Sequence, residues 1–128
     1  MIDHTGINVS DPQRSRAFYE RALAPLGYRV LMELPPEHTG GIVVLGLGVP
    51  PHPDFWLKQG QPQRPALHIA FSASSTEQVD AFYRAALEAG GKDNGAPGPR
   101  PQYHPNYYGA FVLDPDGHNI EAVCHTAK

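Results

Sequence analysis

Two histidines and one glutamate stand where they could bind a divalent metal ion. His4 and His68 each begin a segment with large apolar residues at every second position, which is typical of a strand with two different faces. Glu121 lies in the apolar run Asn119–Cys124, and a lone carboxylate is costly to bury unless it is paired, protonated or bound to metal. Two imidazoles and one carboxylate suit Zn²⁺, Fe²⁺, Mn²⁺, Ni²⁺ or Co²⁺ and leave coordination positions for a substrate.

The two histidines belong to an internal repeat. A shift of 64 residues carries HTGINVSDPQRSRAFYERALAPLG, which starts at His4, onto HIAFSASSTEQVDAFYRAALEAGG, which starts at His68. Taken singly, each histidine could be an ordinary hydrogen-bonded strand residue and Glu121 an edge charge. The three together, with histidine at the same phase of both copies, favour a metal site.

Each copy predicts a strand, a helix and then further strands, which is an α+β arrangement. We expect the first helix to begin at Ser10 or Asp11 and to stop before Gly27. The second should begin at residues 74–76 and stop before residues 90–91. The later strands are predicted at Gly41–Leu47, Asp54–Lys58, Ala110–Leu113 and Asn119–Cys124, with a shorter one near residues 28–34.

The segment Ala96–Tyr108, APGPRPQYHPNYY, is the expected wall or lid of a pocket, because it is too long for a minimal connector. An equally weighted alternative is a proline-stiffened surface loop with tyrosines packed beneath it. The candidate substrate contacts in this segment are Arg100, Tyr103, His104, Tyr107 and Tyr108.

Other aromatic and imidazole side chains have less specific interpretations. Trp56 is either a further substrate-binding aromatic or a core or dimer contact, and the second interpretation is favoured. His38, His52 and His118 lie in or beside predicted turns, so we expect solvated side chains.

Composition bounds the remaining possibilities. The chain has 128 residues, of which 41% are hydrophobic, so we expect one domain over residues 1–128. One cysteine excludes an internal disulfide and a multi-thiolate metal site. A net charge of −3 without a basic run argues against nucleic-acid binding. Without an apolar run of roughly 18 residues or a signal peptide at its start, the sequence predicts no membrane span and a cytoplasmic location.

Three segments give the sequence a specific resemblance over essentially its whole length. HTGINVSDPQRSRAFYERAL, ALHIAF and GAFVLDPDGHNIEAV resemble the vicinal oxygen chelate superfamily, which includes glyoxalase I, extradiol dioxygenases, and the fosfomycin- and bleomycin-resistance proteins. The resemblance implies two βαβββ modules, about residues 1–62 and 63–128, that form a glyoxalase-like open barrel around a metal. It also implies a homodimer with sites formed between chains.

The same resemblance places His4, His68 and Glu121 on three metal-ligand positions. Glyoxalase I-like members have a fourth ligand on the last strand of the first module, where this sequence has Trp56, or Leu57 if the alignment slips by one residue. Neither residue can bind metal, so the set looks more like that of the dioxygenase or fosfomycin-resistance branches.

The sequence therefore predicts a metal-dependent lyase or dioxygenase that acts on a small substrate with vicinal oxygens. Isomerisation or lyase chemistry, ring-opening oxygenation and thiol addition remain open, and Glu121 could exchange a proton as well as bind metal. The alternative is a non-catalytic binder of the bleomycin-resistance type, with an aromatic, acidic cleft. A third interpretation is an inactive relic that keeps only the fold.

Overall fold

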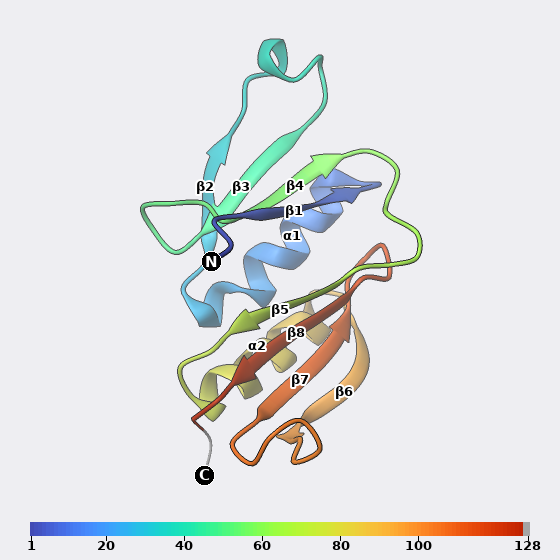
Figure 1. The fold of residues 1–128 in the computed structure, drawn as a ribbon. Coiled ribbons are helices and arrows are strands. Elements are labelled where there is room, and N and C mark those ends of the chain that lie inside the picture. Colours follow the sequence, from blue (N-terminus) through green and yellow to red (C-terminus); the bar gives the residue numbers. More distant parts are fainter. Residues whose placement is uncertain (127–128) are drawn as a thin grey trace.

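The computed structural model describes residues 1–126 and contains two copies of a βαβββ module (Figure 1). Module 1 comprises β1 (Thr5–Val9), α1 (Pro12–Ala22), β2 (Arg29–Glu33), β3 (Val44–Gly48) and β4 (Phe55–Gln59), with short 3-10 helices η1 (Ala24–Leu26) and η2 (Pro36–His38). Module 2 comprises β5 (His68–Ser72), α2 (Thr76–Glu88), β6 (Lys92–Pro99), β7 (Tyr108–Leu113) and β8 (Asn119–Cys124). The predicted α+β class and duplicated βαβββ order are confirmed.

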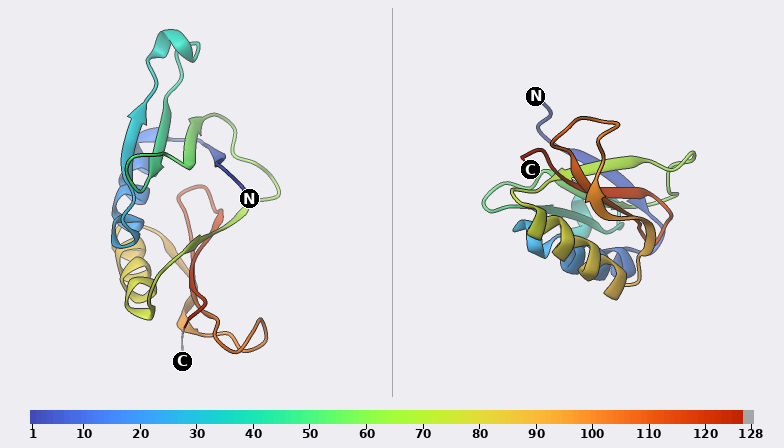
Figure 2. Two further views of the ribbon diagram at one scale, coloured as in Figure 1. Left: turned by 60° about the vertical axis from the view of Figure 1, so that its left-hand side comes forward. Right: turned by 90° about the horizontal axis from the view of Figure 1, so that it is seen from below.

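Each module builds one four-stranded sheet, in the orders β1-β4-β3-β2 and β5-β8-β7-β6. The first strand of each module pairs in parallel with the last, and the remaining pairs are antiparallel. Both sheets are open rather than closed into a complete barrel. Helices α1 and α2 lie next to each other on one side of the two sheets, which leaves the other sheet faces without a covering helix (Figure 2).

Local chemistry explains where the helices begin. The Asp11 side chain accepts a hydrogen bond from the Arg14 backbone N–H, and Pro12 occupies the first turn, where its missing N–H does no harm. In the second module, Ser75 accepts from the Gln78 N–H in the same way. Both caps fall within the start positions predicted from the sequence.

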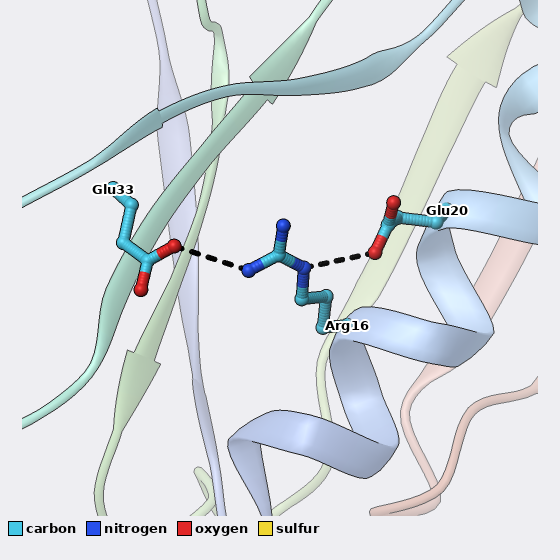
Figure 3. Close-up of polar contacts among 3 residues, drawn as sticks. All are labelled: Arg16, Glu20 and Glu33. Carbon is cyan, nitrogen blue, oxygen red and sulfur yellow. Dashed lines mark hydrogen bonds and ion pairs between the residues drawn. The ribbon is translucent and has the colours of Figure 1, made fainter.

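An ion-pair network on the surface joins α1 to β2. The Arg16 guanidinium donates from Nε to Glu20 Oε1 at 2.9 Å and from Nη1 to Glu33 Oε1 at 3.1 Å (Figure 3). The hydrogen bond to Glu20 is the main cause of a raised Arg16 pKa. Solvent screens both pairs, so the network positions β2 against the helix more than it stabilises the fold.

The hydrophobic core lies between the helices and the sheets and crosses the boundary between the modules. Phe55 of β4 packs edge-on against Tyr19 of α1, with ring centroids 5.1 Å apart. It also packs edge-on at 5.1 Å against Phe71, which belongs to β5 of the other module. The two repeats therefore share one core.

Two predicted segments differ most from the structure, while the other strand boundaries agree within two residues. Strand β3 begins at Val44 rather than at Gly41, because Gly41 has a φ of +93°, which ends an extended strand. Residues 96–99 of the predicted loop belong to β6, so the connection to β7 covers only residues 100–107. The proline- and glycine-rich β6 is an edge strand whose register shifts around Gly95, and edges and bulges are where sheets tolerate such a sequence.

The prediction for His118 was wrong, because its side chain is fully buried, whereas His38 and His52 are exposed as expected. The Asp114 carboxylate accepts hydrogen bonds from the backbone N–H groups of Asp116 and His118 and so folds the turn back on itself. The His118 imidazole then accepts the Leu67 N–H at 2.9 Å. The chain before β5 is thereby tied to the start of β8.

We expect the protein to lose stability in strong alkali through Tyr19. Burial, followed by the negative charge of Asp114, raises the pKa of the Tyr19 hydroxyl well above 10 in the folded state. The unfolded chain ionises near pH 10 while the folded chain keeps its proton, so the free energy of unfolding falls as the pH rises above about 10, by up to about 1.4 kcal/mol per pH unit for this group. Urea unfolding between pH 8 and 11 tests this. Tyr19→Phe should flatten the decline, and an equally steep decline in that variant would contradict the assignment.

Candidate functional site

His68 and Glu121 meet across the parallel pair β5–β8. The register places Ala70 opposite Glu121, so these strands bring the two side chains to the same face of the sheet. His68 Nε2 lies 3.1 Å from Glu121 Oε1, and the Glu121 side chain is only 2% exposed. The other ring nitrogen of His68, Nδ1, lies 3.1 Å from the carbonyl oxygen of Asn119.

The hydrogen-bond partners of His68 imply that a proton or a metal ion lies between its Nε2 and Glu121. A carbonyl oxygen can only accept, so Nδ1 of His68 carries the proton that it donates to Asn119. Nε2 of a neutral ring then directs a lone pair at a carboxylate oxygen, and two acceptors repel unless a cation lies with them. A proton can satisfy this arrangement and gives an imidazolium–carboxylate pair. A metal ion can satisfy it as well, because proteins commonly orient a metal-binding imidazole by a hydrogen bond from Nδ1–H to a carbonyl oxygen.

Tyr107 supplies the second partner of the carboxylate. Its hydroxyl donates a hydrogen bond to Glu121 Oε2. Burial, followed by that hydrogen bond, raises the pKa of Tyr107, so the phenol stays protonated and remains a donor at neutral pH. A Cβ on Gly109 would lie 3.1 Å from Glu121 Oε2, so a larger residue there would crowd the carboxylate.

Tyr107 belongs to an aromatic cluster made of Tyr103, His104, Tyr107 and His125. Tyr103 and His104 pack edge-on against Tyr107, with ring centroids 4.9 and 5.3 Å away. His104 Nε2 lies 2.7 Å from Nδ1 of His125, which follows β8 and which the sequence did not single out for a site. The loop 100–107 and the end of β8 therefore meet beside Glu121.

Arg100 and Tyr108 have other partners. Arg100 donates to the carbonyls of Ala96 and Gly98, so it holds the loop against β6. Tyr108 donates its hydroxyl to Asp80 of α2 at 2.7 Å. Within residues 1–126, neither side chain forms a hydrogen bond with Glu121 or His68.

Sequence reasoning also missed Phe111. It lies opposite Glu121 in the β7–β8 pair, and its ring stacks on the His68 imidazole at 6.1 Å with an interplanar angle of 28°. The guanidinium of Arg100 lies over the same ring at 5.4 Å. An apolar residue in a predicted strand carries no distinguishing signal, because only the register reveals its neighbour.

His4 lies apart from the pair in module 2. Its Nδ1 is 2.7 Å from the carboxylate of Asp3, and its side chain is 59% exposed just before β1. His4 and His68 line the same cavity of about 720 Å³ between the modules. Within residues 1–126, no three His, Cys, Asp or Glu side chains come close enough to hold a metal together. One chain therefore brings together two of the three predicted ligands.

The strand register identifies the residue that corresponds to Glu121 in module 1. Gly6 pairs with Trp56 in β1–β4, just as Ala70 pairs with Glu121 in β5–β8. Leu57 instead points into the core and is 1% exposed. Trp56 thus occupies the equivalent position, and its side chain lies over the helix-free face of the module 1 sheet with His4 and Lys58.

Solved structures with this fold come from several organisms. A glyoxalase/bleomycin resistance protein from Albidiferax ferrireducens is 27% identical, with a TM-score of 0.75 over 95% of this chain and 96% of that one. Glyoxalase I from Zea mays is 25% identical, with a TM-score of 0.69 over 97% of this chain and 46% of that longer one. A glyoxalase/bleomycin resistance protein/dioxygenase family enzyme from Burkholderia phytofirmans, 19% identical with a TM-score of 0.69, shares the fold.

The family comparison covers nearly the whole chain. Comparison with curated proteins gave no significant match. None of the helices formed by residues 1–126 is long and apolar enough to cross a membrane. A family model described as the Glyoxalase/Bleomycin resistance protein/Dioxygenase superfamily matches residues 1–122. The chain therefore belongs to the glyoxalase/bleomycin resistance protein/dioxygenase superfamily.

Proposed function

We propose that this protein is a metal-dependent enzyme of the glyoxalase/dioxygenase type that acts on a small substrate with vicinal oxygens. The observation that carries the proposal is the His68–Glu121 pair, a buried carboxylate facing an imidazole nitrogen whose orientation is set by a backbone carbonyl. The donor set fits a divalent ion such as Zn²⁺, Fe²⁺, Mn²⁺, Ni²⁺ or Co²⁺. Family membership agrees with this function without specifying it.

His68 and Glu121 would hold the metal, with His4 as the third ligand. When bound, the ion would polarise two adjacent substrate oxygens and stabilise negative charge that develops on them. We propose that Glu121 would also exchange a proton with the substrate. Tyr107 would keep the carboxylate in position through its hydrogen bond, and Phe111 and the aromatic cluster would limit access of water.

We further propose that the complete site forms between two copies of the chain. His4 is exposed and is not grouped with His68 and Glu121 among the described residues, so the set is incomplete in one chain. The sheet faces that carry these residues have no helix over them (Figure 2). A homodimer in which module 1 of one protomer faces module 2 of its partner would supply the missing imidazole.

The alternative is a non-catalytic binder of the bleomycin-resistance type. Trp56 favours it, because an indole stands where a fourth metal ligand would be expected and can stack on a ligand instead. The residues that line the cavity beside Trp56 include Lys58 and no carboxylate, which argues against the acidic cleft that a cationic ligand would need.

Metal analysis of the protein purified without a histidine tag tests these proposals. The enzyme proposal predicts about one divalent ion per chain after dialysis, together with a dimer in sedimentation at micromolar concentration. A metal content well below one ion per chain would favour the non-catalytic binder if it were found after incubation with each of the five candidate metals. A monomer that retains the metal would contradict only the proposal that two chains share the site.

A further inference from the structure

The aromatic cluster contains two histidines whose rings contact each other directly. Nε2 of His104 lies 2.7 Å from Nδ1 of His125, and the ring centroids are 4.9 Å apart. His104 belongs to the loop 100–107 and His125 follows β8, so this contact joins the loop to the end of β8 (Figure 1). Neither ring is one of the proposed metal ligands, so the contact needs an explanation of its own.

A neighbouring hydrogen bond fixes which nitrogen carries each proton. The backbone N–H of Asn106 donates to Nδ1 of His104 at 3.1 Å, so that nitrogen has no proton. In a neutral imidazole the proton is then on Nε2, and His104 donates it to Nδ1 of His125. The hydrogen bonds therefore run in one direction, from Asn106 through His104 to His125.

This series of hydrogen bonds has no place for an additional proton. A proton on Nδ1 of His104 would face the N–H of Asn106. A proton on Nδ1 of His125 would face the Nε2–H of His104. Either addition sets two donors against each other and also places a positive charge at the pair. The contact is therefore complete only while both rings are neutral.

The titratable and charged groups around the pair come from the loop and from the ends of β7 and β8. They are Arg100, Tyr103, Tyr107, Tyr108, Glu121 and Cys124. The one carboxylate among them, that of Glu121, already has Tyr107 and His68 as partners. The ion pairs formed within residues 1–126 include neither His104 nor His125, so a positive charge at the pair has no partner of opposite charge there.

The two imidazoles enclose the ring of Tyr107. His104 and His125 each pack edge-on against it, with ring centroids 5.3 Å away in both cases. Tyr103 packs against the same ring at 4.9 Å. Tyr107 in turn donates its hydroxyl to the buried carboxylate of Glu121. The position of the Tyr107 hydroxyl therefore depends on the contact that closes the loop against β8.

We propose that His104 and His125 are positioning residues that hold Tyr107 on Glu121 only while both imidazoles are neutral. Histidine is the side chain whose charge ordinarily changes between about pH 5 and 8, so acid should open the contact and release Tyr107. Glu121 would then lose one of its two hydrogen-bond partners. The consequence for catalysis rests on the proposed function, in which Glu121 holds the metal, whereas the contact itself does not.

Nuclear magnetic resonance of metal-free protein, prepared with EDTA, tests this proposal. At pH 8, long-range ¹H–¹⁵N spectra should place the proton of His104 on Nε2 and show no proton on Nδ1 of His125. Cross-peaks between the rings of Tyr107 and His125 should be present at pH 8 and lost at pH 5. The Tyr107 signals are identified by their absence from Tyr107→Phe, and circular dichroism at both pH values monitors the fold.

Matched variants separate the pair from the other histidines. His104→Phe combined with His125→Phe keeps two aromatic rings beside Tyr107 and removes both titrating groups, so the Tyr107 signals should stay in place from pH 8 to pH 5. His52→Gln removes an exposed histidine between β3 and β4 and should respond to acid as the parent does. His68 is present in every variant, so its own protonation cannot explain a difference between them.

The proposal would be overturned by a proton on Nδ1 of His104 at pH 8, by Tyr107–His125 cross-peaks that persist at pH 5, or by an equal response to acid in the double variant. The proton positions at pH 8 decide the question even if the parent unfolds before pH 5. Since every measurement uses metal-free protein, a failure of the metal proposal leaves these outcomes unaffected.

Discussion

Glu121→Gln is expected to weaken metal binding by at least about a hundredfold and to abolish activity that depends on the metal. The amide keeps the shape of the side chain and loses the negative charge that a divalent ion needs. Its NH₂ group would also face either Tyr107 or His68, each of which now meets a carboxylate oxygen. The readout is metal content after dialysis of untagged protein, with near-stoichiometric binding in the parent and almost none in the variant.

Matched variants distinguish this effect from loss of fold. Glu88→Gln removes an exposed carboxylate, which pairs with Arg21 at 3.5 Å, and should leave metal content unchanged. Tyr107→Phe removes only the hydroxyl that positions Glu121, so we expect a smaller loss of affinity, about tenfold to a hundredfold. His4→Ala tests the third ligand. Full metal retention in both Glu121→Gln and His4→Ala, with native circular dichroism, would refute the metal site.

Phe55→Ala should destabilise the protein by about 3–5 kcal/mol, the usual cost of removing a buried phenylalanine from a core. The ring is 1% exposed and contacts Tyr19 of its own module and Phe71 of the other. A cavity at this position therefore removes packing inside module 1 and across the boundary between the modules. Urea unfolding at neutral pH, followed by far-ultraviolet circular dichroism, measures the change.

The control for this variant is Met32→Ala, because Met32 is 43% exposed on β2. We expect a change within about 1 kcal/mol there. The double variant with Phe71→Ala should be less destabilised than the sum of the two single variants, since the rings contact each other. If Phe55→Ala cost no more than Met32→Ala, the shared core between the modules would be wrong.

Much of the scaffold was predictable because its signals are local. The alternation around His68 and around Glu121 predicted a strand at each, and the Asp11 and Ser75 caps lay within the expected starts. Repetition of the pattern at a fixed shift then predicted two similar modules. The register of β5 with β8 then places Nε2 of His68 3.1 Å from Oε1 of Glu121.

Several parts of the candidate site could not be predicted in this way. Tyr107 was one of several aromatic residues in a loop, and nothing in its sequence neighbourhood indicated that it alone would donate to Glu121. His118 was expected in solvent, and the folded turn buries it. Phe111 became a neighbour of His68 only through the pairing of β7 with β8.

The sequence by itself determined the α+β class and the two similar modules. The tertiary structure decided which strand residues oppose one another, that Trp56 corresponds to Glu121, and that His4 lies apart from the other two predicted ligands. The physical reason is the separation in sequence over which the deciding interactions act. Strand alternation and helix capping act over a few neighbouring residues, whereas register, loop conformation and module packing depend on contacts between residues that are far apart in the chain.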